Sequence, residues 1–287
     1  MFDPKTDKYP YPDRTDEHYL IVKKDNGAVF DGKYPYVDRS RSFRRRQRWV
    51  HLLLRLIVFP MAKVRLGLRV RGRENLKKYR NVLENGVISV SNHVHMWDYI
   101  ALMSVAKPHW PNVLVWAPNV RGESGKLVRM VGGIPIPDGG LGGTLAYVRA
   151  LGDLLRGRGW LQVYAEGSMW EYYAPIRPFK CGAAQLAVEF DKPILPVGYS
   201  YRRPSFLRRV VFRQIACFTM TVGEPLYADG TLPKRERVLD LTKRCHAAVC
   251  RLAGIEPDEN LYPPVFDDTE RIDYYTGTYG VGYRGSR

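Results

Sequence analysis

The chain of 287 residues lacks several features that mark particular classes of protein. Its four cysteines include no C-x-x-C pair, which argues against a disulfide framework and favours a reduced, cytosolic setting. No G-x-S-x-G motif offers a serine nucleophile for an acyl group. The N-terminal residues are polar and contain no apolar segment of the secretory kind, so we expect no signal peptide. A globular protein with a substantial hydrophobic core remains as the basic prediction.

Acidic residues are also scarce: 29 Asp and Glu stand against 45 Lys and Arg, a net charge of +16. Residues 39–80 hold fifteen basic residues and one acidic residue, so this segment alone carries +14. Such a segment suits nucleic acid, an anionic membrane or a phosphorylated substrate. No helix-turn-helix, zinc-finger or RNP pattern occurs, and aromatic residues do not alternate with the basic ones. Nucleic acid is therefore the least favoured partner.

Residues 39–80 form a basic arm whose apolar part is interrupted by Arg55, Lys63 and Arg65. This segment is too charged for a transmembrane helix. On a helix kinked by Pro60, one apolar face is expected from Val50, Leu53, Leu54, Ile57, Met61, Val64 and Leu68, with Trp49 and Phe59 beside it. We predict a helix lying in the interface of a membrane with anionic lipids, at its cytoplasmic side, as a monotopic or peripheral contact. The alternative is that this face packs on the protein's own core.

Residues 81–254 alternate apolar runs with helical patterns, which predicts an α/β domain with a mostly parallel central sheet flanked by helices. Strands are expected at 86–91, 112–118, 133–137, 160–166, 193–201 and 218–227. Helices are expected at 97–106, 123–131, 142–158, 182–190 and 235–254. Residues 1–38 are predicted to be a flexible polar extension, and residues 255–287 an irregular tail.

The stretch NHVHMWD lies where the first of these strands leads into a helix. Four residues separate His93 from Asp98, an interval that crosses a turn and brings a carboxylate against an imidazole. An aspartate that accepts from one ring nitrogen leaves the other nitrogen free to take a proton from an alcohol. Asp98 could instead cap its helix, and His95 competes for the same carboxylate. The spacing alone leaves these alternatives open.

A second polar segment, AEGSMW followed by PFKCGAAQLA, begins where the 160–166 strand ends. Glu166, Gly167 and Ser168 form a sharp turn whose glycine lets backbone amides approach a ligand, and Lys180 stands near the start of the next helix.

Four sequence blocks occur in order: NHVHMWD, GGIPIPDG, AEGSMW with PFKCGAAQLA, and ILPVGY. Together they resemble the glycerolipid acyltransferase family, of the bacterial 1-acylglycerol-3-phosphate acyltransferase kind. The resemblance runs from about residue 88 to residue 199. The resemblance implies O-acyl transfer from acyl-CoA or acyl carrier protein to a lysophospholipid hydroxyl, with phosphatidic acid as the leading product. It implies His93 as general base, Asp98 as its orienting group, and Glu166, Gly167 and Ser168 along the acceptor site. It also implies that no cofactor is needed beyond the acyl donor.

The sequence departs from the family where arginines usually hold the acceptor phosphate. Asp138 and the pair Met169-Trp170 occupy those places. Arg177 and Lys180 are the predicted replacements, with the basic residues of 121–129 as the alternative. A different lyso-lipid or alcohol acceptor is a second hypothesis, and a non-catalytic protein that binds anionic membranes or nucleic acid is a third.

Cys245, His246 and Cys250 match no zinc spacing, so we expect no metal.

Overall fold

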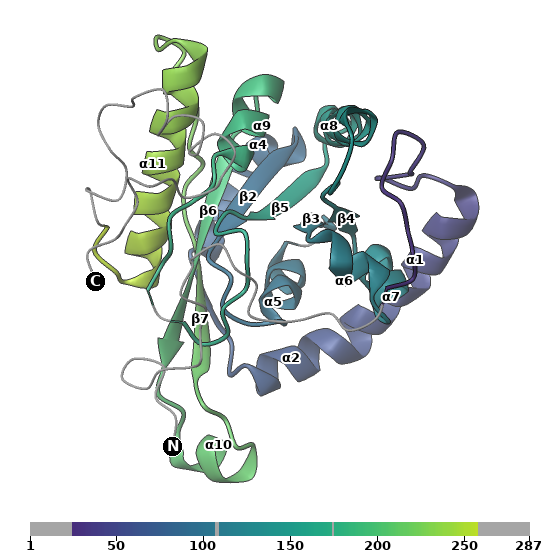
Figure 1. Cartoon of the computed structure of the whole chain (residues 1–287). Coiled ribbons are helices and arrows are strands. Elements are labelled where there is room, and N and C mark those ends of the chain that lie inside the picture. The colour runs from purple at the N-terminus through teal and green to yellow at the C-terminus, as the bar shows by residue number, and fades with distance from the viewer. Residues whose placement is uncertain (1–24, 107–108, 174, 258–287) are drawn as a thin grey trace.

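A single sheet of seven strands forms the centre of the computed structural model, which describes residues 25–106, 109–173 and 175–257 (Figure 1). The strands are β1 (Arg69–Arg71), β2 (Val87–Ser91), β3 (Asn112–Val115), β4 (Gly133–Pro135), β5 (Trp160–Tyr164), β6 (Ile194–Arg202) and β7 (Cys217–Val222). Their order is β1-β7-β6-β2-β5-β3-β4, and only the β6–β7 pair is antiparallel. The six predicted strands and the mostly parallel α/β fold are confirmed.

Helices cover both faces of the sheet. They are α1 (Arg41–Leu53), α2 (Phe59–Arg65), α3 (Arg73–Lys78), α4 (Arg80–Glu84), α5 (Asp98–Val105), α6 (Ala117–Arg121), α7 (Gly125–Met130), α8 (Leu141–Arg156), α9 (Gly182–Phe190), α10 (Phe206–Val211) and α11 (Lys234–Ala253). One core contains Ile88 and Val90 of β2 with side chains from α8, α9 and α11. A second core contains Val87 with side chains from α4 and α5. Burial on both faces explains why β2 is apolar at these positions, as parallel sheets require.

The sheet order brings the two polar segments of the sequence together. Strands β2 and β5 are parallel neighbours, and Ser91 pairs with Tyr164. The loop of residues 92–97 after β2 and the loop of residues 165–181 after β5 therefore leave the sheet at the same edge. In open α/β sheets this carboxyl edge is where ligands bind.

The basic arm begins with one continuous, bent helix, made of α1, the π-helical turn η1 (Leu54–Val58) and α2. The Phe59 amide donates to the Leu54 carbonyl, five residues earlier. Pro60 has no amide hydrogen to donate and lies at the first turn of α2, where none is required. The helix therefore passes Pro60 by a local change of register.

The bent helix has two apolar sides, which corrects the prediction of one face. Leu54 and Phe59 are buried against Tyr99 and Met103, and Leu68 is buried in the second core. An outer apolar stripe is exposed and consists of Trp49, Leu52, Leu53, Leu56, Ile57, Met61 and Val64. Within the described residues, no helix is both long and apolar enough to span a membrane.

The boundaries predicted for the arm and the extension need correction. Residues 69–80 belong to the body, because β1 pairs with β7 and α3 packs against that strand. Residues 25–38 are also packed: Phe30 and Tyr36 are buried in the first core, and the Arg121 and Arg129 guanidiniums donate to backbone carbonyls of this segment. Residues 1–24 and 258–287, where the remaining extension and most of the tail were predicted, lie outside the described residues.

Candidate active site

His93 and Asp98 meet at the carboxyl edge of the sheet. His93 lies in the loop after β2, and Asp98 is the first residue of α5. The His93 Nδ1 atom is 2.7 Å from the Asp98 Oδ2 atom. The Asp98 side chain is 1% exposed, whereas the His93 side chain is 22% exposed. When the Asp98 carboxylate accepts a hydrogen bond from Nδ1, the lone pair of His93 lies on Nε2.

Asp98 is held by more than the histidine. Its Oδ2 atom also accepts from the Val94 amide at 3.1 Å, and its Oδ1 atom accepts from the Tyr164 hydroxyl at 2.5 Å. The Tyr199 hydroxyl donates to the Asp98 backbone carbonyl at 2.7 Å. A buried carboxylate needs such donors to stay ionised away from water. The carboxylate therefore orders the loop that precedes α5 as well as the histidine.

Tyr164 is a site residue that the sequence prediction missed. It ends β5, and its ring stacks on the His93 imidazole with centroids 3.8 Å apart and planes 13° from parallel. Burial raises the pKa of Tyr164 well above 10, and the nearby Asp98 carboxylate raises it further, so its phenol is a neutral donor. Its position directly before AEGS was the available sequence signal, but only the β2–β5 register brings it to His93.

His95 has other partners. Its Nδ1 atom accepts from the Trp97 amide at 3.1 Å, and its Nε2 atom lies 3.2 Å from a carboxylate oxygen of Glu171. Burial lowers the pKa of His95 to about 4, and the charge of Arg65 contributes in the same direction. The imidazole is therefore neutral at ordinary pH and donates to Glu171. Of the two histidines in the motif, it is His93 whose ring contacts the Asp98 carboxylate.

The turn after β5 rests on a buried ion pair. Glu166 and Arg177 have side chains only 3% and 2% exposed, and the Arg177 Nη2 atom is 2.5 Å from the Glu166 carboxylate. Burial raises the pKa of Glu166, and the Arg177 charge opposes this change. Arg177 also donates to the Ser168 hydroxyl and to the Ser168 carbonyl, each at 2.5 Å. Arg177, predicted to contact a phosphate, thus lies beneath the turn and bonds to two of its three residues.

The turn also packs against the His93 loop. The Glu166 carboxylate accepts a hydrogen bond from the His93 backbone, and the Trp170 amide donates to the His93 carbonyl at 3.3 Å. The Tyr172 amide donates to the Val94 carbonyl at 3.0 Å. The predicted residues His93, Asp98, Glu166, Gly167 and Ser168 therefore belong to one connected structure.

Lys180 completes this structure. Gly167 has a φ of +83°, a conformation that favours glycine, and a Cβ built there would lie 2.7 Å from the Lys180 Cε atom and 3.1 Å from its Nζ atom. The Lys180 amide donates to the Ala165 carbonyl at 2.7 Å. Lys180 is half-buried, and its side chain packs against Gly167.

The alternative basic residues lie elsewhere. Arg121 forms an ion pair with Asp138, the residue found where the family usually has an arginine. The Arg129 guanidinium is bonded to carbonyls of residues 35, 36 and 133. Lys126 is exposed on α7. Among the residues that the structure describes, no three His, Cys, Asp or Glu side chains gather as a metal site would require.

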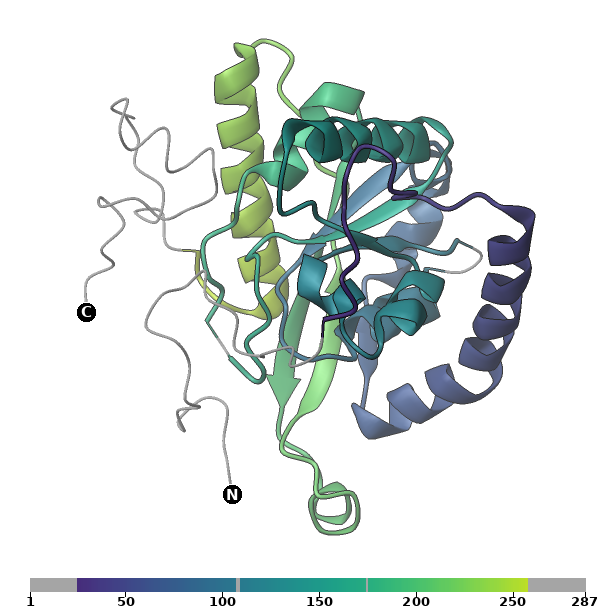
Figure 2. The same cartoon turned by 45° about the vertical axis from the view of Figure 1, so that its right-hand side comes forward.

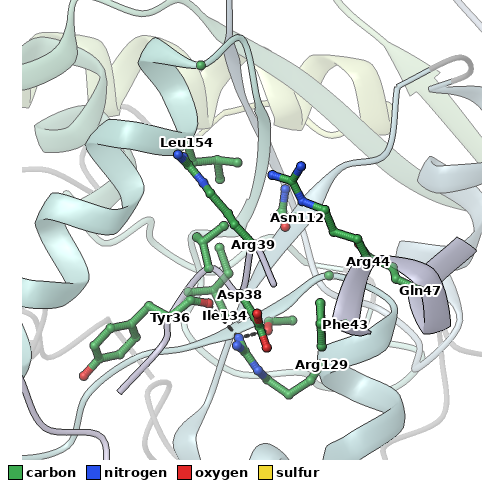
Figure 3. A pocket seen from close by; sticks show the side chains of 14 residues that line it. Tyr36, Asp38, Arg39, Phe43, Arg44, Gln47, Asn112, Arg129, Ile134 and Leu154 are labelled. Carbon is green, nitrogen blue, oxygen red and sulfur yellow. Dashed lines mark hydrogen bonds between the residues drawn. The ribbon is translucent and has the colours of Figure 1, made fainter. Parts of the chain in front are cut away.

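A cavity of about 370 Å³ lies at the opposite edge of the sheet (Figure 3). Its lining includes Asn112 and Gly133, the first residues of β3 and β4. Figure 3 shows Arg129 bonded at one side of this cavity, with Arg39 and Arg44 above it. None of the seven predicted site residues lines it, so the cavity is separate from the His93 site.

Comparison with known proteins gives a family match and a similar fold. The sequence model of the Acyltransferase family matches residues 67–200, a segment that contains His93, Asp98 and the 165–181 loop. No curated protein sequence matches the chain. The crystal structure of the 1-acyl-sn-glycerophosphate (LPA) acyltransferase PlsC from Thermotoga maritima is similar, with a TM-score of 0.51 and 17% sequence identity. The match covers 76% of this chain and 84% of PlsC. At this identity the likeness establishes a shared fold.

Proposed function

We propose that the acyltransferase domain of this chain, which contains residues 67–200, moves a fatty acyl group from a thioester to the free hydroxyl of a lysophospholipid. The observation that supports this proposal best is the buried Asp98 carboxylate 2.7 Å from His93 Nδ1, beside the Glu166–Ser168 turn. In this proposal His93 is the general base, Asp98 orients it, and the acceptor hydroxyl attacks the thioester directly.

The proposed reaction exchanges the acyl group between the thioester sulfur and the acceptor oxygen. The His93 Nε2 atom takes the hydroxyl proton while the acceptor oxygen attacks the thioester carbonyl carbon. A carbon–oxygen bond forms, the carbon–sulfur bond breaks, and the departing thiolate receives the proton from the imidazolium. Asp98 stabilises that imidazolium and keeps Nε2 oriented toward the acceptor. The donor is acyl-CoA or acyl carrier protein, used as a co-substrate without a further cofactor.

The leading acceptor is 1-acyl-sn-glycerol-3-phosphate, which would yield phosphatidic acid. Lys180 supports this choice because its ammonium group stands on the Gly167 turn, next to the loop that carries His93. An ammonium group is a suitable partner for a phosphate. In this proposal Ser168 and the Gly167 backbone line the acceptor site, and Arg177 holds them in place from below.

A second acceptor class is favoured by a specific observation. Asp138, Met169 and Trp170 stand where the family usually has arginines, and Arg177 is buried in an ion pair with Glu166, so the site has less positive charge than a phosphate acceptor suggests. A lyso-lipid with a different headgroup, or another alcohol, is therefore the alternative acceptor.

The outer apolar stripe supports association with an anionic membrane. Its seven exposed apolar side chains continue directly from a cluster of arginines at 44–48. An apolar surface of this kind, next to basic residues, is typical of a helix that lies in the headgroup layer. We propose that the chain works as a peripheral or monotopic enzyme at the cytoplasmic face, where the acceptor is found.

Mass spectrometry of the products tests this proposal. The purified chain is incubated with mixed acyl-CoA donors and with lysophospholipids of several headgroups, and both thiol release and acylated lipids are measured. We expect the wild type to produce acylated lysophosphatidate. The His93→Ala and Asp98→Asn variants should produce almost none. His109→Gln is the matched control, since His109 lies outside the site, and it should retain activity. Full activity of His93→Ala would overturn the mechanism, and acylation of another acceptor alone would select the second class.

A further inference from the structure

A second apolar and basic surface lies outside the arm, at the far end of the β6–β7 connection. We name residues 203–213, which contain α10, the α10 tip. Figures 1 and 2 show it projecting from the body at the end of these two strands. Its apolar side chains are all exposed, and α10 has no buried residue; they are Phe206, Leu207, Val210, Val211 and Phe212. An exposed apolar group of this size marks a surface of interaction.

The charge around the α10 tip has one sign. Arg203, Arg208, Arg209 and Arg213 belong to it, and no acidic residue occurs between Lys192 and Gly223. Apolar side chains interspersed with arginines match the layered chemistry of a bilayer surface, where acyl chains lie beneath anionic headgroups. A protein partner would need an acidic and apolar surface shaped to a projecting tip.

The α10 tip is bonded to the end of the arm helix. The Arg208 Nη1 atom donates to the Val64 carbonyl at 2.8 Å, and the Gln214 side chain donates to the Arg65 carbonyl. The Arg202 Nη2 atom donates to the Gly67 carbonyl at 2.5 Å. The Val64 carbonyl also accepts from the Gly67 amide at 3.1 Å, so the Arg208 bond is a second one to this carbonyl near the C-terminus of α2. The α10 tip therefore lies beside Val64, the last residue of the outer apolar stripe.

The loop that carries His93 is near this junction. Helix α2 packs against α5, where Phe59 shares a core cluster with Tyr99 and Met103, and α5 begins at Asp98 directly after this loop. Met96 in the same loop has a side chain that is 60% exposed. In both Figures 1 and 2 α10 lies beyond the end of α2 on the side away from α8, and the arm helix lies beside α5.

We infer that the α10 tip is a second membrane-inserting element, which together with the outer apolar stripe seats the chain on an anionic bilayer. The bilayer then holds the enzyme through two adjoining elements, the outer apolar stripe and the α10 tip. Such seating presents the active-site loop to the headgroup layer, where a lysophospholipid hydroxyl lies. The inference rests on the proposed membrane function of the arm, but the two are separable by experiment.

Site-specific labelling tests the insertion directly. All four native cysteines are buried, so an environment-sensitive fluorophore can be attached to a Val211→Cys variant of the full chain. Vesicles of phosphatidylcholine and phosphatidylglycerol, in about a three-to-one ratio, provide the anionic surface. We expect a blue shift of the label at Val211→Cys and none at Leu145→Cys, an exposed position on α8 at the other end of the molecule. Vesicle binding without a blue shift at Val211→Cys would overturn the inference.

A partitioning experiment measures the contribution of the α10 tip. The Phe206→Ser, Leu207→Ser, Val210→Ser triple variant should bind the same vesicles on the order of tenfold more weakly, because three apolar side chains no longer insert. The Leu141→Ser, Leu145→Ser variant is the matched control and should bind normally. Equal binding by the triple variant and the wild type would overturn the inference. The triple variant should transfer an acyl group to a short-chain, monomeric lysophospholipid at the normal rate. If the wild type does not acylate this soluble acceptor, the result contradicts the proposed chemistry and not the membrane inference.

Discussion

The ring of Tyr164 lies on the ring of His93, with centroids 3.8 Å apart, while its hydroxyl donates to the same carboxylate that binds His93. Tyr164 thus contacts both members of the proposed catalytic pair. It comes from β5, whereas His93 and Asp98 follow β2. The pairing of these two strands is what assembles the site.

Removing the hydroxyl of Tyr164 should slow the reaction with little effect on acceptor binding. In Tyr164→Phe the stacking remains but Asp98 loses one donor, and a hydrogen bond to a charged group contributes about 1.5–3 kcal/mol. We expect kcat to fall roughly tenfold or more with KM nearly unchanged. Tyr147→Phe on α8 is the control for loss of a hydroxyl. An unchanged kcat in Tyr164→Phe would show that Asp98 is sufficiently held without it.

Replacing Arg177 should lower the free energy of unfolding more than it weakens acceptor binding. In Arg177→Met the Glu166 carboxylate loses its buried partner, which costs about 3–5 kcal/mol in the free energy of unfolding. Chemical denaturation measures this loss. The Glu166→Gln, Arg177→Met double variant should recover part of it, because no unpaired charge remains buried. A normally stable Arg177→Met variant with a raised acceptor KM would instead support the predicted phosphate contact.

Lys180 should discriminate acceptors by headgroup. Lys180→Gln should raise KM for lysophosphatidate roughly tenfold, since a charge-assisted hydrogen bond to phosphate is lost. For an acceptor with an uncharged headgroup, KM should change little. Lys126→Gln, at an exposed position on α7, serves as the control for a surface lysine. If KM rises equally for both acceptors, Lys180 supports the Gly167 turn and does not bind phosphate.

The buried His95 should make stability depend on pH. Its pKa is about 4 in the folded chain, mainly through burial, against 6.5 when unfolded. Above pH 6.5 both states are neutral, so the full stability is present. As pH falls from 6.5 to 4 the unfolded chain takes up a proton that the folded chain does not, and stability drops by roughly 3 kcal/mol. His95→Gln should flatten this part of the curve in urea denaturation. An identical slope would assign the pH dependence to other groups.

Adjacent leucines in the arm should behave differently. Leu53 is 52% exposed in the outer apolar stripe, whereas Leu54 is 5% exposed in the core. Leu53→Ser should weaken vesicle binding several-fold and leave the melting temperature nearly unchanged. Leu54→Ser should lower stability by about 2–5 kcal/mol, as large-to-small core substitutions do. Sedimentation with vesicles and thermal unfolding separate the two effects. If both variants lose stability equally, the outer apolar stripe is part of the protein's own core.

Sequence periodicity was sufficient for the strands of residues 81–254, because a parallel sheet covered on both faces requires apolar runs there. Periodicity did not predict β1, a three-residue edge strand whose first and last residues are exposed arginines. It also did not predict the short helices α3, α4, α6 and α10. A strand that buries little has no apolar pattern to detect. The basic residues around β1 also made this segment part of the predicted arm.

Within the site, the sequence by itself determined that a histidine and an aspartate lie at a strand–helix junction and that a glycine turn follows a later strand. The tertiary structure decided which histidine binds the carboxylate, because the loop directs His93 to Asp98 and directs His95 toward Glu171. It also decided that Arg177 lies buried under the turn and that Tyr164 stacks on His93. These relationships depend on strand register and side-chain packing between distant segments. Local spacing along the chain carries no information about either.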